Sequence, residues 1–365
     1  MPRRKPEELS YAKAGVDRAL RARSKKALDI LYETYRFSRY GSIVKLPYGN
    51  IFPINGNLYL DLVIEEIGTK VLIAQLAEKY DTIGIDGIAM AANDVIRSGA
   101  RPLALADNIH AHVSNPALVA EWMKGIVRGA EEAECVVPSG EIGDVPDLLK
   151  GVVEGRGFDM IFACVGEVLK RDIIYGNDLK PGDAVIGLRS SGVHSNGISL
   201  VRRILFKQWG GVYEPFDLPE GFDSELVCEV LEPTRIYVKP FMKFVRSHRT
   251  KATVHITGDA YLKFDKLMGL NKGIGFEFDN FKPQAIFGLI QEVSKQRRNP
   301  ISDEEMFKTF NMGWGFAVVV DNAIKDEAVD SLERSGIQAE QIGTVTGSRQ
   351  IIVKHKGRKI LLLAK

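Results

Sequence analysis

The feature that most constrains this chain is a run of small residues leading directly into an amphipathic segment. Residues 190–197 read SSGVHSNG, and ISLVRRILF follows at once. Apolar side chains recur there at i, i+3 and i+7, so we predict a helix whose apolar stripe docks on a core. Its first turn would leave backbone N–H groups free to bind an anion beside the small-residue loop. On spacing alone, an ordinary capped turn is an equally good interpretation.

Periodicity along the rest of the chain favours an α+β fold over a doubly wound sheet. Residues 56–66 alternate cleanly, with four aliphatic side chains on one face, as in a half-buried strand. Helices are expected through about Tyr35, after Asp86 as far as Gly99, and over residues 116–133. These elements follow one another without a regular βαβ repeat. Residues 169–183 are polar and carry Pro and Gly, so we expect two domains, 1–170 and 171–365.

Composition indicates an ordinary globular protein. The chain has 365 residues, 45% hydrophobic and 26% charged, which is enough for two domains with normal cores. The formal net charge of +2 gives no electrostatic case for a nucleic-acid partner. Basic residues cluster at 3–5 and between 18 and 26, but a solvated helix face explains them best. Because no apolar run reaches a membrane span and no apolar leader is present, we expect a cytoplasmic protein without a membrane partner.

Five stretches of the sequence share their order with the signatures of one enzyme family. They are SYAKAGVD (10–17), DTIGIDGIAMAANDVIRSGARP (81–102), SSGVHSNGISLVRRIL (190–205), EPTRIYVK (232–239) and MFKTFNMG (306–313). Together they resemble the phosphoribosylformylglycinamidine cyclo-ligases, or AIR synthetases, over nearly the whole chain. The resemblance implies a homodimer whose N-terminal domains pair to form a β-barrel, and a C-terminal α/β sandwich domain.

The resemblance also implies an activity. Enzymes of this family use ATP to convert formylglycinamidine ribonucleotide to aminoimidazole ribonucleotide, ADP and phosphate in purine biosynthesis. The formyl oxygen leaves poorly, so its phosphorylation gives an iminophosphate that the amidine nitrogen can displace, and this requires mainly positioning and charge neutralisation. The implied cofactors are ATP and Mg²⁺. Two alternatives stay open: a paralogous ATP-dependent enzyme with another substrate, and a non-catalytic nucleotide-binding scaffold.

Three carboxylates are candidate Mg²⁺ ligands through this resemblance. Glu65 matches the first aspartate of the family's DGVGTK motif, and Asp94 matches the aspartate of its NDL motif. Glu141 belongs to SGEIGDVP (139–146), which is similar to the family's GGETAEMP and which we expect to be a loop. Carboxylate oxygens are suitable ligands for Mg²⁺. Pattern alone favours the wet side of a surface helix for Asp94 and an edge charge for Glu65.

The other candidates would contact substrate and nucleotide. The resemblance implies that Lys70, His194 and His255 join Asp94 as catalytic residues, with His194 either binding the substrate phosphate or moving a proton. The implied nucleotide-binding residues are Gly68, Thr69, Lys70, Asn93, Asp94, Gly140, Glu141, Ser191, Gly192, Ser195, Asn196, Thr257 and Gly258. The simpler alternatives are a solvent-exposed lysine for Lys70 and a hydrogen-bonded core histidine for His255.

Three departures from the family pattern bear on the ligand site. Glu66 stands at the first glycine after the acidic residue of DGVGTK. Ser139 and Ile142 replace a glycine and a threonine in the acidic stretch, and Asp259-Ala260 stand at two glycines of the family's HLTGGG. Loss of glycine narrows the approach of backbone to a ligand. The added charges of Glu66 and Asp259 require a nearby cation or outward-pointing side chains.

Overall fold

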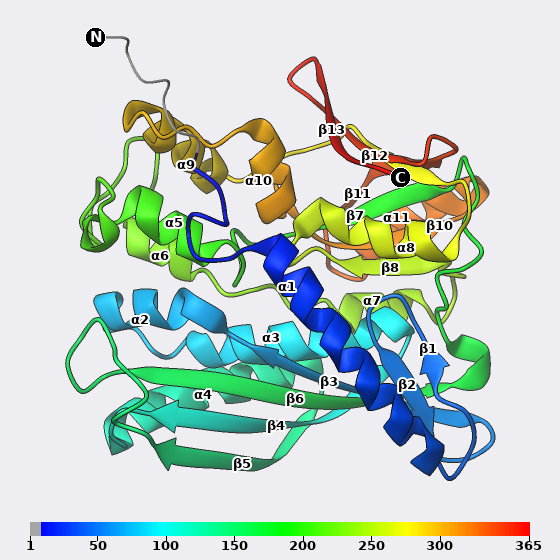
Figure 1. Ribbon diagram of the computed structural model, residues 1–365, viewed down its shortest axis with the longest axis horizontal. Helices are drawn as coiled ribbons and strands as arrows, with labels where there is room; N and C mark the ends of the chain where they lie inside the picture. Colours follow the sequence, from blue (N-terminus) through cyan, green and yellow to red (C-terminus); the bar gives the residue numbers. More distant parts are fainter. Residues whose placement is uncertain (1–8) are drawn as a thin grey trace.

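Two β-sheets organise the computed structural model, which describes residues 9–365 (Figure 1). In these residues the first sheet has six strands in the order β1-β2-β3-β6-β4-β5, and the second has seven in the order β13-β12-β9-β11-β7-β10-β8. Neighbouring strands are antiparallel except for the parallel pairs β4–β5 and β9–β12. The mixed sheets and the many helices confirm the predicted α+β class.

The first half of the chain forms the six-stranded sheet and the helices on it. Its strands are β1 (Val44–Lys45), β2 (Asn50–Pro53), β3 (Leu58–Glu66), β4 (Arg101–Ala111), β5 (Val136–Asp144) and β6 (Phe158–Leu169). Its helices are α2 (Val71–Ala77), α3 (Ile83–Val95) and α4 (Pro116–Ala133), with short 3₁₀ helices η2 (Gly68–Lys70), η3 (Ile96–Ser98) and η4 (Lys170–Asp172). The helix predicted over 116–133 is confirmed.

The second half forms the seven-stranded sheet. Its strands are β7 (Ala184–Arg189), β8 (Ala252–His255), β9 (Gly275–Phe278), β10 (Trp314–Val320), β11 (Ala339–Thr346), β12 (Gln350–His355) and β13 (Arg358–Ala364). Its α-helices are α5 (Ile198–Leu205), α6 (Leu226–Leu231), α7 (Val238–Phe244), α8 (Asp265–Leu270), α9 (Ala285–Gln296), α10 (Asp303–Thr309) and α11 (Lys325–Arg334). The 3₁₀ helices are η5 (Lys207–Trp209), η6 (Ala260–Phe264) and η7 (Asn322–Ile324). The helix predicted after the small-residue loop is confirmed as α5.

Helix α3 lies between the first sheet and the second half of the molecule (Figure 1). All but one of its residues are buried, so the wet face expected from its pattern is wrong. The polar side chains of that face meet the second half instead: Asn93 Nδ2 donates to Arg235 O at 2.8 Å, and Asn93 Oδ1 accepts from Tyr237 N at 2.8 Å. A polar helix face can contact either water or a polar protein surface, and here it contacts the second half of the molecule.

Strand β3 alternates as predicted, but its aliphatic face is the exposed one. Leu62 is 61% and Ile64 69% exposed, whereas Tyr59 and Asp61 are 8% and 6% exposed. Apolar side chains of a half-buried strand normally face the core, so this sheet leaves an apolar surface uncovered in the single chain.

Strand β5 corrects the loop expected at 139–146. Residues up to Asp144 extend the edge strand, and Asn108 of β4 lies opposite Glu141 in parallel register. Pairing with residues 33 positions earlier in the chain leaves no local sequence signal, and the Gly-rich stretch favours a turn by itself.

The N-terminal segment crosses the front of the molecule (Figure 1). Residues 3–5 of the basic cluster lie outside the described residues. Helix α1 (Arg18–Lys25) and 3₁₀ helix η1 (Lys26–Phe37) then run diagonally from the second half towards β1 and β2. No residue of either helix is buried, so contacts at their two ends position them. Among the described residues, we find no helix that is both long and apolar enough to span a membrane.

Candidate active site

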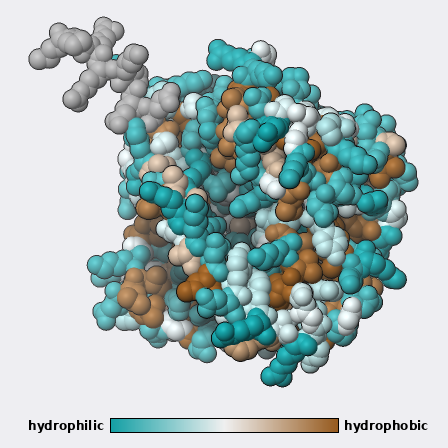
Figure 2. All heavy atoms as spheres, turned by 45° about the vertical axis from the view of Figure 1, so that its right-hand side comes forward, coloured by the Kyte–Doolittle hydropathy of each residue, from teal (hydrophilic) through white to brown (hydrophobic). Residues whose placement is uncertain are grey.

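A cavity of about 1140 Å³ lies where the two halves and the N-terminal segment meet. Its wall includes β3, the start of α5, residues 257–267 and one face of α1. Hydrophilic side chains border the hollow on the face of the molecule seen in Figure 2. A space of this size can hold a nucleotide-sized ligand.

Asp94 faces this cavity from the C-terminal end of α3 and is 5% exposed. Its Oδ1 accepts a hydrogen bond from His255 Nδ1 at 2.7 Å, and its Oδ2 forms an ion pair with Arg97 Nη2 at 2.6 Å. Burial alone would raise the pKa of Asp94, but the Arg97 charge and the His255 hydrogen bond outweigh burial and hold the pKa below its usual value. Asp94 is therefore an ionised carboxylate at the cavity wall.

His255 supports this carboxylate from behind. It is fully buried, and burial lowers its pKa to about 4 despite the opposing effect of Asp94. A neutral ring must then carry its proton on Nδ1 to donate to Asp94. Because His255 does not border the cavity, it corresponds to the hydrogen-bonded core histidine of the simpler interpretation and positions Asp94.

Glu65 lies beside Asp94 at the end of β3 and also borders the cavity. Burial, and then the neighbouring Asp94 carboxylate, raise the pKa of Glu65 to about 8. No group of three or more His, Cys, Asp or Glu side chains able to hold a metal ion occurs within residues 9–365. Mg²⁺ is commonly held by one or two carboxylates together with phosphate oxygens and water, so the adjacent Glu65 and Asp94 fit this ion.

Glu141 and Gly140 do not join this group in the single chain. Along the sheet, Glu141 lies opposite Asn108, and Asn108 lies opposite Ile161. Ile161 lies opposite Glu66 at the end of β3, so three strand spacings, about 14 Å, separate Glu141 from Glu66. Within one chain Glu141 therefore lies apart from the carboxylates of β3 and α3, and its role as a shared metal ligand stays a prediction.

Lys70 lies inside the protein rather than at the cavity, so its predicted role as a phosphate ligand stays a prediction. It is fully buried, and its Nζ donates to Asp86 Oδ1 at 2.9 Å and to Glu232 O at 2.7 Å. The same Asp86 oxygen accepts from Ser195 Oγ at 3.0 Å and from both the backbone N and Oγ1 of Thr234, at 2.8 and 2.7 Å. This buried cluster ties α3 and η2 to two loops of the second half. By its pattern alone, Asp86 would fall with Asp94 on the wet side of its helix.

His194 is likewise part of the interior rather than the cavity wall. It is fully buried with φ +61°, and its Nε2 accepts from Ser191 N at 3.2 Å and from Arg235 N at 3.5 Å. Burial lowers the pKa of His194 well below its usual value. A Cβ on Gly315 would lie 2.5 Å from His194 Cε1, so the ring occupies a tight slot. Both predicted roles of His194, phosphate binding and proton transfer, therefore lack access to a ligand here.

Other predicted residues do meet at the cavity. Those that border it are Gly68, Thr69, Ser195, Asn196, Thr257 and Gly258. Three others are engaged elsewhere: Asn93 binds the second half, Ser191 Oγ donates to Pro233 O at 2.5 Å, and Gly192 O accepts from Asn311 Nδ2 at 2.8 Å. The small-residue loop thus contributes its C-terminal end to the cavity and its N-terminal end to packing.

Several cavity residues were missed by sequence reasoning. Asp61 borders the cavity, and burial raises its pKa to about 6. Lys263 donates to His255 O at 3.1 Å and to Thr257 Oγ1, and burial lowers its pKa to about 8. Alternation along β3 could have suggested Asp61, whereas no local pattern marks Lys263. Of the two added charges noted in the sequence, Asp259 has a cation, because Arg18 Nε lies 3.1 Å from its Oδ1.

Comparison with known proteins gives a consistent result. Residues 50–168 match the family model of the AIR synthase related protein, N-terminal domain, and residues 180–356 match that of the C-terminal domain. A protein of Pyrococcus furiosus named phosphoribosylformylglycinamidine cyclo-ligase is 37% identical over 360 residues, which cover 97% of this chain and 100% of the relative. One of the same name from Methanocaldococcus jannaschii is 34% identical over 368 residues, covering 97% and 99%.

Solved structures share the fold at low sequence identity. The hydrogenase maturation protein HypE of E. coli superposes with a TM-score of 0.58 at 16% identity, covering 84% of this chain and 85% of that one. PurL of T. maritima, complexed with ATP, superposes with a TM-score of 0.55 at 13% identity, covering 87% of this chain and 44% of that one. Both likenesses concern the fold alone.

Proposed function

Because this chain belongs to the AIR synthase related family, and its relatives over nearly the full length are phosphoribosylformylglycinamidine cyclo-ligases, we propose that it is an ATP-dependent cyclo-ligase. It converts formylglycinamidine ribonucleotide to aminoimidazole ribonucleotide, ADP and phosphate. The observation that carries the proposal is one cavity bordered by Glu65 and Asp94 from the first half and by Ser195, Asn196 and Thr257 from the second. The names of the relatives disfavour both the paralogous enzyme and the scaffold.

The reaction requires two displacements in one place. The formyl oxygen of the substrate attacks the γ-phosphorus of ATP, and ADP leaves. The amidine nitrogen then attacks the activated carbon, the ring closes, and phosphate leaves with the former formyl oxygen. Phosphoryl transfer of this kind depends mainly on positioning and on neutralising phosphate charge.

The chain's own groups can meet these needs. Glu65 and Asp94 would hold Mg²⁺, which neutralises phosphate oxygens when bound. Arg97 and His255 fix the Asp94 carboxylate through contacts at 2.6 and 2.7 Å. Thr69 Oγ1 lies 3.3 Å from Ser199 Oγ in the first turn of α5, so hydroxyl and backbone N–H donors converge where the two halves meet.

The proposal extends to a homodimer with a barrel formed by two copies of the first sheet. Its support is the uncovered aliphatic face of β3, where Leu62 and Ile64 are 61% and 69% exposed; Leu103 of β4, two strands away in the same sheet, is 38% exposed. Burying these side chains against a second copy would be favourable, because exposed apolar patches are costly in water. We expect Ile64→Asp to yield monomers in light scattering; a dimer unaffected by this change would refute the pairing.

Two further proposals rest on the same family membership. We propose that residues 1–170 and 171–365 are separate folding domains, since β6 ends at Leu169 and β7 begins at Ala184 without a shared sheet. We also propose that the enzyme acts in the cytoplasm, where soluble biosynthetic substrates are found.

Measurement of ADP release tests the function. With ATP, Mg²⁺ and formylglycinamidine ribonucleotide, the account predicts substrate-dependent ADP together with the ring product. ADP formed only with a different acceptor would favour a paralogous enzyme. Nucleotide binding without any ADP release would favour a scaffold.

A further inference from the structure

One face of α1 forms a wall of the cavity. Arg18, Arg21, Ala22 and Lys25 all border it, at spacings of i, i+3, i+4 and i+7. These spacings place the four residues on one side of the helix. In the described part of the chain, neither Arg21 nor Lys25 makes an ion pair or a side-chain hydrogen bond, whereas Arg18 makes several. The basic cluster read from sequence as a solvated helix face is thus partly directed at the cavity.

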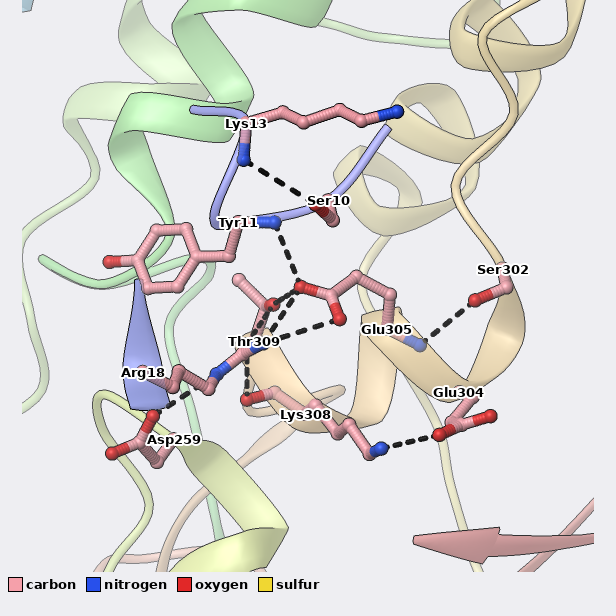
Figure 3. Close-up of polar contacts among 10 residues, drawn as sticks. All are labelled: Ser10, Tyr11, Lys13, Arg18, Asp259, Ser302, Glu304, Glu305, Lys308 and Thr309. Carbon is pink, nitrogen blue, oxygen red and sulfur yellow. Dashed lines mark hydrogen bonds and ion pairs between the residues drawn. The ribbon is translucent and has the colours of Figure 1, made fainter. Parts of the chain in front are cut away.

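Arg18 fixes the start of this helix to the second half (Figure 3). Its guanidinium contacts Asp259 Oδ1 at 3.1 Å and Glu305 Oε1 at 3.0 Å, and it donates to Lys308 O at 2.9 Å and Thr309 Oγ1 at 2.7 Å. Four partners on one planar group set its orientation as well as its place. Asp259, which stands where the family has glycine, therefore has a specific partner on α1.

The other end of the segment is attached to the first half. Lys45 Nζ lies 3.9 Å from the centre of the Tyr32 ring, and Asn50 Nδ2 donates to Tyr35 OH at 2.7 Å. The segment therefore spans the cavity between two attachment points. Its position does not depend on burial of its own side chains.

The cavity wall carries charges of both signs, and part of them are balanced within the protein: Arg97 pairs with Asp94, and Arg18 pairs with Asp259. The β3 side carries Asp61, Glu65 and Glu66, and Asp94 adjoins it. On the α1 side, Arg21 and Lys25 border the cavity and make no ion pair within residues 9–365. A ligand with phosphate groups and a bound divalent cation has the complementary arrangement, because the cation meets the carboxylates and the phosphate oxygens meet the basic side chains.

We propose that α1 is the phosphate-binding wall of this cavity: Arg21 and Lys25 bind the phosphate of a phosphorylated ligand, and Arg18 is the positioning residue that holds them there. The phosphate belongs either to ATP or to the ribose 5-phosphate part of the substrate. Only this choice of ligands rests on the proposed function. The charge and geometry of the wall do not.

The test compares Arg21→Gln/Lys25→Gln with Arg23→Gln, a matched control on the same helix that does not border the cavity. Calorimetry gives the Kd of two phosphorylated probes, ATP with Mg²⁺ and ribose 5-phosphate, and of their phosphate-free counterparts, adenosine and ribose. We expect the double variant to raise the Kd of at least one phosphorylated probe by about tenfold or more, the range of a lost charge-assisted hydrogen bond. The Kd of adenosine should be unchanged. A higher Kd for ATP alone, or for ribose 5-phosphate alone, would identify which phosphate is bound.

The proposal is overturned if the unaltered protein binds neither phosphorylated probe, or if the double variant binds both as tightly as Arg23→Gln does. For Arg18→Gln we expect a higher Kd of the same phosphorylated probe without a change for adenosine, which general loosening of the fold would not produce. These are binding measurements, so an enzyme that binds normally but fails to form ADP would contradict the proposed function and leave this inference standing.

Discussion

Two clusters at the ends of α3 each contain an aspartate of that helix but have different environments. The interdomain cluster, Lys70, Asp86 and Thr234, is buried, and a single oxygen of Asp86 accepts four hydrogen bonds. The cavity cluster, Glu65, Asp94 and His255, places two adjacent carboxylates at the wall of a large cavity. Both look like ligand-binding motifs in sequence. Burial and existing partners decide which carboxylate can still accept a ligand.

The two clusters also differ in whether they contribute to stability or to catalysis. In the interdomain cluster the ion pair holds two halves in one arrangement, and its cost of desolvation is met by several hydrogen bonds. In the cavity cluster the repulsion between two carboxylates is not relieved by protein groups alone, because burial and Asp94 still raise the pKa of Glu65 to about 8. Changes in the first cluster should therefore act on unfolding, and changes in the second on turnover.

The largest effect is expected for Lys70→Met. It leaves the Asp86 charge buried without its cation, and breaking a buried pair in this way costs about 3–5 kcal/mol. Urea unfolding measures the loss. The double variant Lys70→Met/Asp86→Asn is the control and should recover much of it. An unchanged free energy of unfolding combined with lost ATP affinity would return Lys70 to the phosphate role.

Next comes Asp94→Asn in the cavity cluster. We expect turnover to fall by about 10²–10³-fold, the range for loss of one electrostatic group at a reacting phosphate. The free energy of unfolding should change less than for Lys70→Met, because Arg97 and Asp94 border the cavity rather than a filled interior. ADP release and urea unfolding are measured side by side, with exposed Asp147→Asn as control. Turnover within a few-fold of the control would contradict the proposed role of Asp94 in the reaction.

A third carboxylate, Asp61, sharpens the comparison through pH. Burial raises its pKa to about 6, so the folded chain binds this proton more tightly than the unfolded chain, whose aspartates titrate near ~3.9. Protonated Asp61 therefore makes its full contribution to the free energy of unfolding below pH ~4. This contribution is lost as the pH rises through about 6. Asp61→Asn should then stabilise the fold by on the order of 2 kcal/mol at pH 8 and hardly at all at pH 4. An equal change in the free energy of unfolding at pH 4 and pH 8 would contradict a raised pKa for Asp61.

The smallest effect on stability is expected for Asp259→Gly. This ion pair is partly exposed, so its loss should cost less than about 1 kcal/mol, and glycine also suits the left-handed φ of +67° at this position. Hydrogen exchange in α1 should nevertheless become faster, because Arg18 loses one of its anchors. Unaltered exchange in residues 18–25 would show that Glu305 and Thr309 alone fix the helix.

Local patterns were sufficient to predict several elements. The alternation of residues 56–66 and the apolar stripe that follows residue 197 predicted β3 and α5, because each element is encoded by its own periodicity. The stretch at 139–146 failed, because pairing of β5 with β4 is a long-range event. Pattern alone favoured water at the polar face of α3, since a sequence pattern does not distinguish water from the polar loops of a second domain.

The candidate site was predictable to a similar degree. The resemblance grouped Glu65, Asp94 and the end of the small-residue loop, and these residues border one cavity in the structure. It did not separate them from Lys70 and His194, because motif matching records residue type and order but not burial. The role of the basic face of α1 could not be predicted, because the sequence of one helix does not show which surface that face borders.

The most direct test of the whole account is a crystal structure with a non-hydrolysable ATP analogue, Mg²⁺ and formylglycinamidine ribonucleotide. The account predicts phosphate groups in the cavity between the Glu65–Asp94 pair and α1, with Lys70 still bound to Asp86. Nucleotide on another surface, or Lys70 Nζ withdrawn from Asp86 and bound to a phosphate, would contradict it.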